Sequence, residues 1–133
     1  MSPDYLEQIR KYVVVPTLRD IGLYSESAER LIMATGMAES RYEYIDQVER
    51  GGERRAGYAY GFWQMEEATH DDIWRNYLKY NQTLANKIRM KMVVGMNDAL
   101  QMQGNMYYGT AMCRTHYRRI SAPLPDPNDI ERL

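Results

Sequence analysis

The residue whose position most clearly suggests chemistry is Glu39. It follows Ile32 by seven residues on a segment with helical apolar spacing, and seven residues turn a straight helix by only about 20°. We therefore expect the carboxyl to point in the direction of the buried stripe. A carboxyl that loses water favours its neutral form, can stay protonated near neutral pH and can act as a general acid. The competing interpretation is that Glu39 lies past the helix end, in solvent or paired with Arg41.

The segment that precedes Glu39 is predicted to be a helix. The hydroxyl of Ser25 can accept a hydrogen bond from a free amide of the first turn, which is a typical helix start. Downstream, one face collects Ala28, Leu31, Ile32 and Thr35. This helix would hold Glu39 at its C-terminal end.

Four more segments have helical patterns. The first is expected after Ser2 and runs toward Gly22, with a kink or break where Pro16 pushes Val15 away from helical geometry. Another follows Thr69, the predicted N-cap, and a short helix is expected at 84–92. The last should start near Asn105 and end at the prolines after residue 120, and residues 128–133 suggest the first turn of one more helix.

Residues 42–65 have a different pattern, because four glycines alternate there with aromatic side chains. Such a segment favours turns and short strands over a helix. We therefore predict a single domain over residues 1–133 that is mainly α, with a small β-hairpin insertion around residues 42–65.

Composition excludes several classes of function. A formal net charge of −1 lacks the basic excess that nucleic-acid binding needs, and no apolar stretch reaches the roughly 20 residues of a membrane span. A single cysteine, Cys113, forms no internal disulfide. The first ten residues carry charges where a signal peptide would be apolar, so we expect synthesis in the cytoplasm without export by this N-terminus.

Three motifs give a more specific indication. Residues 37–40 are Met-Ala-Glu-Ser, residues 60–65 are Tyr-Gly-Phe-Trp-Gln-Met followed by Thr69, and Asn105 precedes Gly109 by four positions. In this order they resemble the signature of the soluble lytic transglycosylases and their lysozyme-like relatives, and the resemblance covers residues 31–117.

The resemblance implies a role for several residues in cleaving peptidoglycan. Glu39 would protonate the glycosidic oxygen between N-acetylmuramic acid and N-acetylglucosamine, and Gln64 would help to hold the sugar. Further sugar contacts are expected from Ser40, Tyr60, Trp63 and Tyr108, whereas Phe62 is expected in the core. For Trp63 a core position is the alternative.

A second resemblance concerns residues 64–70. The goose-type lysozymes have Gln-x-Asp-x-x-x-His here, which is similar to Gln64, Glu66 and His70 of this chain. Glu66 could then activate a water on the far side of the sugar, as in inverting hydrolases. Without that step, the muramic acid's own hydroxyl attacks and gives the anhydro product of a lytic transglycosylase. The alternatives are a solvated Glu66 before a helix and a His70 that lies on the first turn without a role in binding.

The resemblance implies no cofactor. A metal site from His70, Asp71 and Asp72 has little support, because adjacent residues on a helix point in different directions.

The chain also departs from the family, since the helix with an Ala-x-x-Tyr-Asn motif that should follow the Asn105 segment is absent. A further segment or a partner chain would complete the fold, or catalysis has been lost. The architecture resembles bacteriophage proteins that act on the host cell wall as lysis enzymes or virion components. The alternative to an enzyme is a catalytically weak structural or wall-binding virion subunit.

Overall fold

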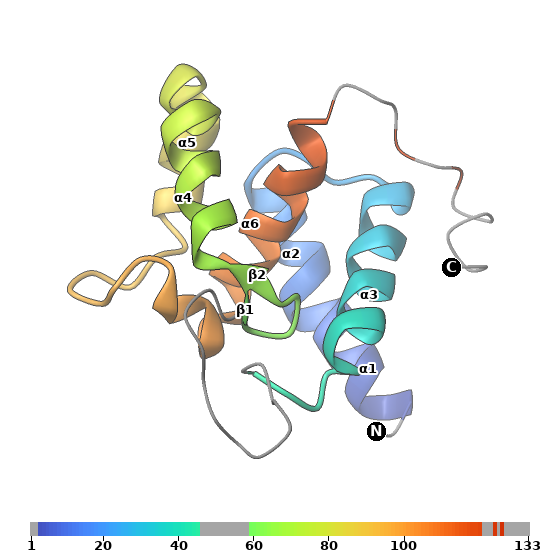
Figure 1. Cartoon of the computed structure of the whole chain (residues 1–133). Helices are drawn as coiled ribbons and strands as arrows, with labels where there is room; N and C mark the ends of the chain where they lie inside the picture. The colour runs from blue at the N-terminus through green and yellow to red at the C-terminus, as the bar shows by residue number, and fades with distance from the viewer. Residues whose placement is uncertain (1–2, 46–58, 121–123, 125, 127–133) are drawn as a thin grey trace, which may run out of the picture.

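The structure is a computed structural model that describes residues 3–45, 59–120, 124 and 126 (Figure 1). The described part is mainly helical with one small antiparallel sheet, which confirms the predicted mainly-α class. Its helices are α1 (Pro3–Ile9), α2 (Val15–Asp20), α3 (Glu26–Ser40), α4 (Glu67–Asn76), α5 (Gln82–Arg89) and α6 (Met106–Arg118). Shorter turns are the π-helical η1 (Arg10–Val14) and the 3₁₀ turns η2 (Leu78–Tyr80) and η3 (Leu100–Gln103).

The N-terminal helical segment passes Pro16 without the predicted departure of Val15 from helical geometry. Val15 has φ −60° and ψ −51°, and its amide donates to the carbonyl oxygen of Arg10, five residues earlier. The wider π turn before Pro16 accommodates a residue that has no N–H and whose ring crowds the preceding turn. The predicted stop is confirmed, because Gly22 has φ +77° and its amide donates to the oxygen of Arg19.

The helix starts were predicted with mixed success. As expected, Ser25 Oγ accepts from the amide of Ala28 at 3.0 Å. The start near Asn105 is also confirmed, and the structure shows in addition that the Asn105 side chain caps α6. The prediction that Thr69 caps α4 is wrong: the helix begins at Glu67, because strand β2 leads directly into it. Helix α5 begins two residues before the predicted start, after the cap residue Asn81.

The two strands β1 (Ala59–Tyr60) and β2 (Met65–Glu66) pair antiparallel, with Ala59 opposite Glu66 and Tyr60 opposite Met65. They confirm a hairpin at the end of the predicted insertion. Residues 46–58 of that insertion, and the helical turn predicted at 128–133, lie outside the described residues.

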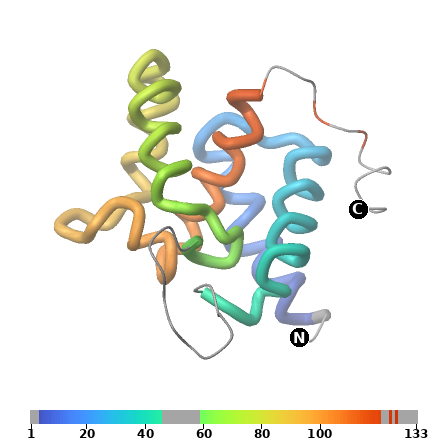
Figure 2. The backbone as a smooth tube through the Cα atoms, in the orientation of Figure 1, coloured from blue at the N-terminus to red at the C-terminus, as the bar shows by residue number. Residues whose placement is uncertain are grey.

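Helix α6 occupies the middle of the molecule (Figure 2). Its side chains contribute to two apolar clusters. One cluster joins it to α4, α5 and the turn η3, and the other joins it to α1, α2, α3 and the hairpin loop. The hairpin is therefore fixed next to α3, α4 and α6. No helix in the described ranges is long and apolar enough to cross a membrane.

Candidate active site

A cleft of about 310 Å³ opens where α3, the hairpin, α4 and α6 meet. Four residues predicted from the sequence line it: Glu39 from the end of α3, Trp63 and Gln64 from the hairpin loop, and Glu66 from the end of β2. The other lining residues are Thr35, Met65, Thr69, Cys113, His116 and Tyr117. The cleft thus collects two carboxyl groups and several polar side chains from segments that are distant in sequence.

Glu39 borders this cleft but is exposed, so the prediction that it is partly buried is wrong. Glu39 lies on the same face of α3 as Ile32, which is fully buried, as the helical period predicts. The depth differs because Glu39 lies about 10 Å farther along the axis, in the last turn of α3, where fewer neighbours cover the helix. In the free protein the carboxyl of Glu39 is in contact with water.

Gln64 immediately precedes strand β2, and Glu66 is the last residue of that strand. Gln64 has φ +51°, a conformation that costs a non-glycine residue roughly 1 kcal/mol, and its Nε2 donates to the carbonyl oxygen of Gly61 at 2.7 Å. Its amide oxygen has no partner among the described residues and remains an acceptor. Glu66 is exposed and occupies the N-cap position of α4, where the helix dipole stabilises a negative charge.

Trp63 forms part of the cleft wall but is only 5% exposed. Its Nε1 donates to the carbonyl oxygen of Ile32 at 2.9 Å, and its ring packs edge-on against Tyr42 and Phe62. The prediction of a core position for Phe62 is confirmed. Trp63 is held mainly by the core and presents little surface for a sugar ring.

Ser40 does not contribute to the cleft, contrary to the prediction. It is 3% exposed, and its hydroxyl donates to the carbonyl oxygen of Phe62 at 2.7 Å and accepts from the amide of Tyr42 at 3.1 Å. The hydroxyl also lies 3.1 Å from the carbonyl oxygen of Gly36. Ser40 therefore ties the end of α3 to the hairpin loop and is not available to a sugar.

His70 and Tyr108 form a buried pair away from the cleft, which corrects both predicted sugar contacts. His70 Nε2 lies 2.6 Å from the Tyr108 hydroxyl, and His70 Nδ1 lies 2.9 Å from a carboxylate oxygen of Asp71. Tyr108 accepts from Trp74 Nε1 at 2.8 Å, and burial raises the pKa of its phenol. This network joins α4 to α6, and the part of His70 that is accessible faces a separate depression between α4 and α5.

Tyr60 is half-buried, packs against the apolar cluster of α4 to α6, and is not among the residues that line the cleft. The structure therefore does not support the prediction that Tyr60 contacts a glycan in this cleft. Its place in β1 explains the difference, because Tyr60 pairs with Met65 and lies beside the core.

Six cleft residues were not predicted as site candidates: Thr35 on α3, Met65 on β2, Thr69 on α4, and Cys113, His116 and Tyr117 on α6. The hydroxyls of Thr35 and Tyr117 are 2.8 Å apart and link the two helices. Positions 113, 116 and 117 share one helix face, so the spacing was a usable signal. Burial, and next the charge of Glu39, raise the pKa of the Cys113 thiol, which therefore stays protonated and is no nucleophile.

His70, Asp71 and Asp72, the residues weighed as metal ligands in the sequence, form hydrogen bonds with other side chains. Asp72 accepts from Asn76 Nδ2 and from Arg119 Nη1, both at 2.6 Å, and these hydrogen bonds, in that order, lower the pKa of its carboxyl. Within the described ranges, no three His, Cys, Asp or Glu side chains are grouped in a way that could hold a metal ion.

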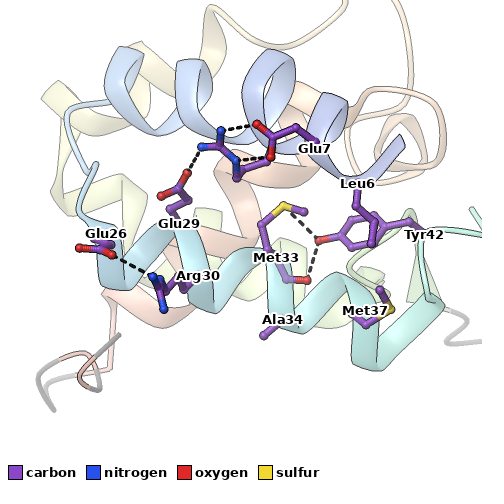
Figure 3. Close-up of a pocket in the computed structure, with 10 residues that line it drawn as sticks. Leu6, Glu7, Glu26, Glu29, Arg30, Met33, Ala34, Met37 and Tyr42 are labelled. Atoms are coloured by element: carbon purple, nitrogen blue, oxygen red, sulfur yellow. Dashed lines mark hydrogen bonds and ion pairs between the residues drawn. The ribbon is translucent and has the colours of Figure 1, made fainter. Parts of the chain in front are cut away.

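A larger groove of about 640 Å³ lies between α1 and α3 (Figure 3). Its polar groups bind one another: Arg10 donates to Glu29 at 2.6 Å and to Glu7 at 2.9 Å, and the Tyr42 hydroxyl donates to the carbonyl oxygen of Met33 at 2.8 Å. Arg10 thus binds both the Glu7 and Glu29 carboxylates and balances one of their two negative charges. The smaller cleft, and not this groove, brings Glu39 and Glu66 together.

The chain matches no protein-family model, no curated protein and no solved structure. The candidate site therefore depends on the geometry described above.

Proposed function

We propose that the cleft bordered by Glu39 and Glu66 cleaves the β-1,4 bond between N-acetylmuramic acid and N-acetylglucosamine in peptidoglycan. The observation that carries this proposal is the gathering of Glu39, Gln64 and Glu66 in one cleft. A lysozyme-like fold, a bacteriophage source and action at the host cell wall or in a virion belong to the same proposal.

Glu39 is the general acid of the proposed reaction. A glycan strand in the cleft displaces water from the carboxyl, which favours its neutral form and allows it to protonate the glycosidic oxygen. This step is required because Glu39 is exposed in the free protein.

Glu66 is the second carboxylate. It lies at the N-terminus of α4 on the rim of the cleft, where it can accept the proton of an attacking water. If Glu66 takes no part, the muramic acid hydroxyl attacks the anomeric carbon and the product has an anhydro end. Gln64 contributes an amide oxygen as an acceptor for a sugar hydroxyl, and neither route needs a cofactor.

A second candidate function is a wall-binding or structural subunit with weak catalysis. The exposure of Glu39 favours it, because a general acid gains from losing water before the substrate arrives. The burial of Ser40, His70 and Tyr108 also leaves fewer side chains to hold a sugar.

Product analysis separates the two functions. Purified peptidoglycan is incubated with the wild-type chain, with Glu39→Gln and with Glu67→Gln, and the released muropeptides are identified by mass spectrometry. Glu67 is the matched control, because it is an exposed carboxylate beside Glu66 that does not line the cleft.

We expect release by wild type and Glu67→Gln but not by Glu39→Gln, and reducing or anhydro ends report the route. Folded wild-type protein that binds peptidoglycan without releasing muropeptides would favour the wall-binding function.

A further inference from the structure

His116 lies on the side of α6 that lines the cleft. A series of hydrogen bonds between side chains of α6 and α4 fixes the orientation of its ring. Arg119, the C-cap residue that follows α6, has its Nη2 3.2 Å from His116 Nδ1. The other side of the guanidinium donates from Nη1 to Asp72 at 2.6 Å, and Asp72 accepts at the same distance from Asn76. Two side chains of α4 therefore fix the arginine that contacts the histidine.

This contact determines where the imidazole carries its proton. A guanidinium has only N–H donors and remains charged in proteins, so Nδ1 of His116 must be the acceptor in the contact with Arg119. A neutral imidazole with an unprotonated Nδ1 carries its single proton on Nε2. The geometry thus selects one of the two tautomers.

The ring is also kept neutral. Burial, and next the positive charge of Arg119, lower the pKa of His116, because both disfavour a second positive charge. A proton on Nδ1 would in addition remove the acceptor of Arg119. The cleft carboxyls Glu39 and Glu66 lie on other elements, and Asp72 is already paired with the guanidinium.

The remaining ring nitrogen is available to a ligand. Nε2 of His116 has no hydrogen-bond partner among the described residues. It does not belong to the buried polar atoms of these residues that lack a partner, and it is therefore exposed to solvent. A half-buried ring with one nitrogen fixed and the other accessible loses little freedom when it binds.

We propose that His116 is a substrate-binding residue whose Nε2–H donates to the acetamido carbonyl oxygen of a glycan in the cleft, with Arg119 and Asp72 as positioning residues. An amide carbonyl is a strong uncharged acceptor, and both sugars of peptidoglycan carry one. This role rests on the proposed function. It makes His116 a neutral donor and not an acid or a base in the reaction.

The first test concerns the tautomer and needs no substrate. Long-range ¹H–¹⁵N correlation spectra of the labelled full chain distinguish protonated from unprotonated ring nitrogens, and the spectrum of His116→Gln assigns the two histidines. We expect a neutral ring protonated on Nε2 at pH 7. Arg119→Leu should populate both tautomers, and Arg118→Leu, a change at the exposed neighbouring arginine, should leave the tautomer unchanged.

The second test concerns the ligand. The probe is the β-1,4-linked tetramer of N-acetylglucosamine. It is titrated into the Glu39→Gln protein, which cannot cleave it and serves as the reference, and into the same protein with His116→Phe or His116→Gln added. Loss of one hydrogen bond predicts that His116→Phe binds about 5- to 10-fold more weakly. His116→Gln should retain most of the affinity, because its Nε2 amide can donate from a similar position.

The outcomes separate the two proposals. A ring protonated on Nδ1 overturns the inference whatever the protein does with glycans. Equal binding by the Glu39→Gln reference and by its His116→Phe variant overturns the donor role and leaves the proposed function standing. No binding of the tetramer by any variant overturns both the donor role and the glycan cleft.

Discussion

Gly36 gives a stability prediction whose sign depends on the structure. In an exposed helix, Gly→Ala stabilises by about 1 kcal/mol. A Cβ at Gly36 would lie 2.2 Å from Cζ of Tyr42 and 2.3 Å from its hydroxyl oxygen, whereas carbon atoms in contact are about 3.5–4.0 Å apart. The Tyr42 ring would have to move by more than about 1 Å.

The cost follows from what holds that ring. Tyr42 is 2% exposed, donates to the carbonyl oxygen of Met33 at 2.8 Å, and packs edge-on against Phe62 and Trp63. Overpacking costs about 1–3 kcal/mol, and a buried hydrogen bond left unmade costs a similar amount. After subtracting the gain in helix propensity, Gly36→Ala should destabilise the fold by about 1–5 kcal/mol.

Urea unfolding followed by circular dichroism measures this difference, provided the slope of the transition is unchanged. Gly104→Ala is the matched control, because Gly104 has φ −112° and no atom lies within 4 Å of the added Cβ. Its stability should stay within about 0.5 kcal/mol of wild type. A Gly36→Ala protein as stable as wild type, or more stable, would refute the packing of Tyr42 against α3.

Three further substitutions test the assignments around the cleft. Ser40→Ala should cost about 1–3 kcal/mol of unfolding free energy, because the carbonyl of Phe62 loses its donor, with unchanged glycan affinity; the reverse pattern would restore Ser40 as a sugar contact. Tyr108→Phe should destabilise by a similar amount, since Trp74 loses its acceptor, and a loss of glycan affinity alone would contradict its structural role. Asp72→Asn should lower the urea midpoint at pH 7. Because the pKa of the Asp72 carboxyl is lowered on folding, this contribution is present above about pH 3.9 and disappears as the pH falls through the folded pKa, so the midpoints should converge in acid. A difference that persists there would exclude the ionised carboxylate as its cause.

Features set by neighbouring residues could be predicted from the sequence. The cap at Ser25, the helix start near Asn105 and the stop at Gly22 depend on a few adjacent groups, and each prediction is confirmed. The start of α4 was missed, because a cap at Thr69 assumes a loop before the helix, whereas strand β2 leads directly into it.

Features set by distant contacts could not be predicted. The helical period gave the direction of Glu39, but its exposure depends on where the elements packed on α3 end. His70 and Tyr108 are 38 residues apart and bury each other, which no local pattern reveals. The contact of Arg119 with Asp72 spans 47 residues, so the constraint on His116 was equally hidden.

The most direct test of the proposed function is the initial rate at which purified peptidoglycan is converted to soluble fragments. Removing a general acid lowers a rate by about 10²- to 10⁴-fold. We therefore predict a loss of that size for Glu39→Gln and a rate close to wild type for Glu67→Gln. Equal rates for wild type and Glu39→Gln, or no conversion by the folded wild-type chain, would contradict the assignment of this cleft as a peptidoglycan-cleaving site.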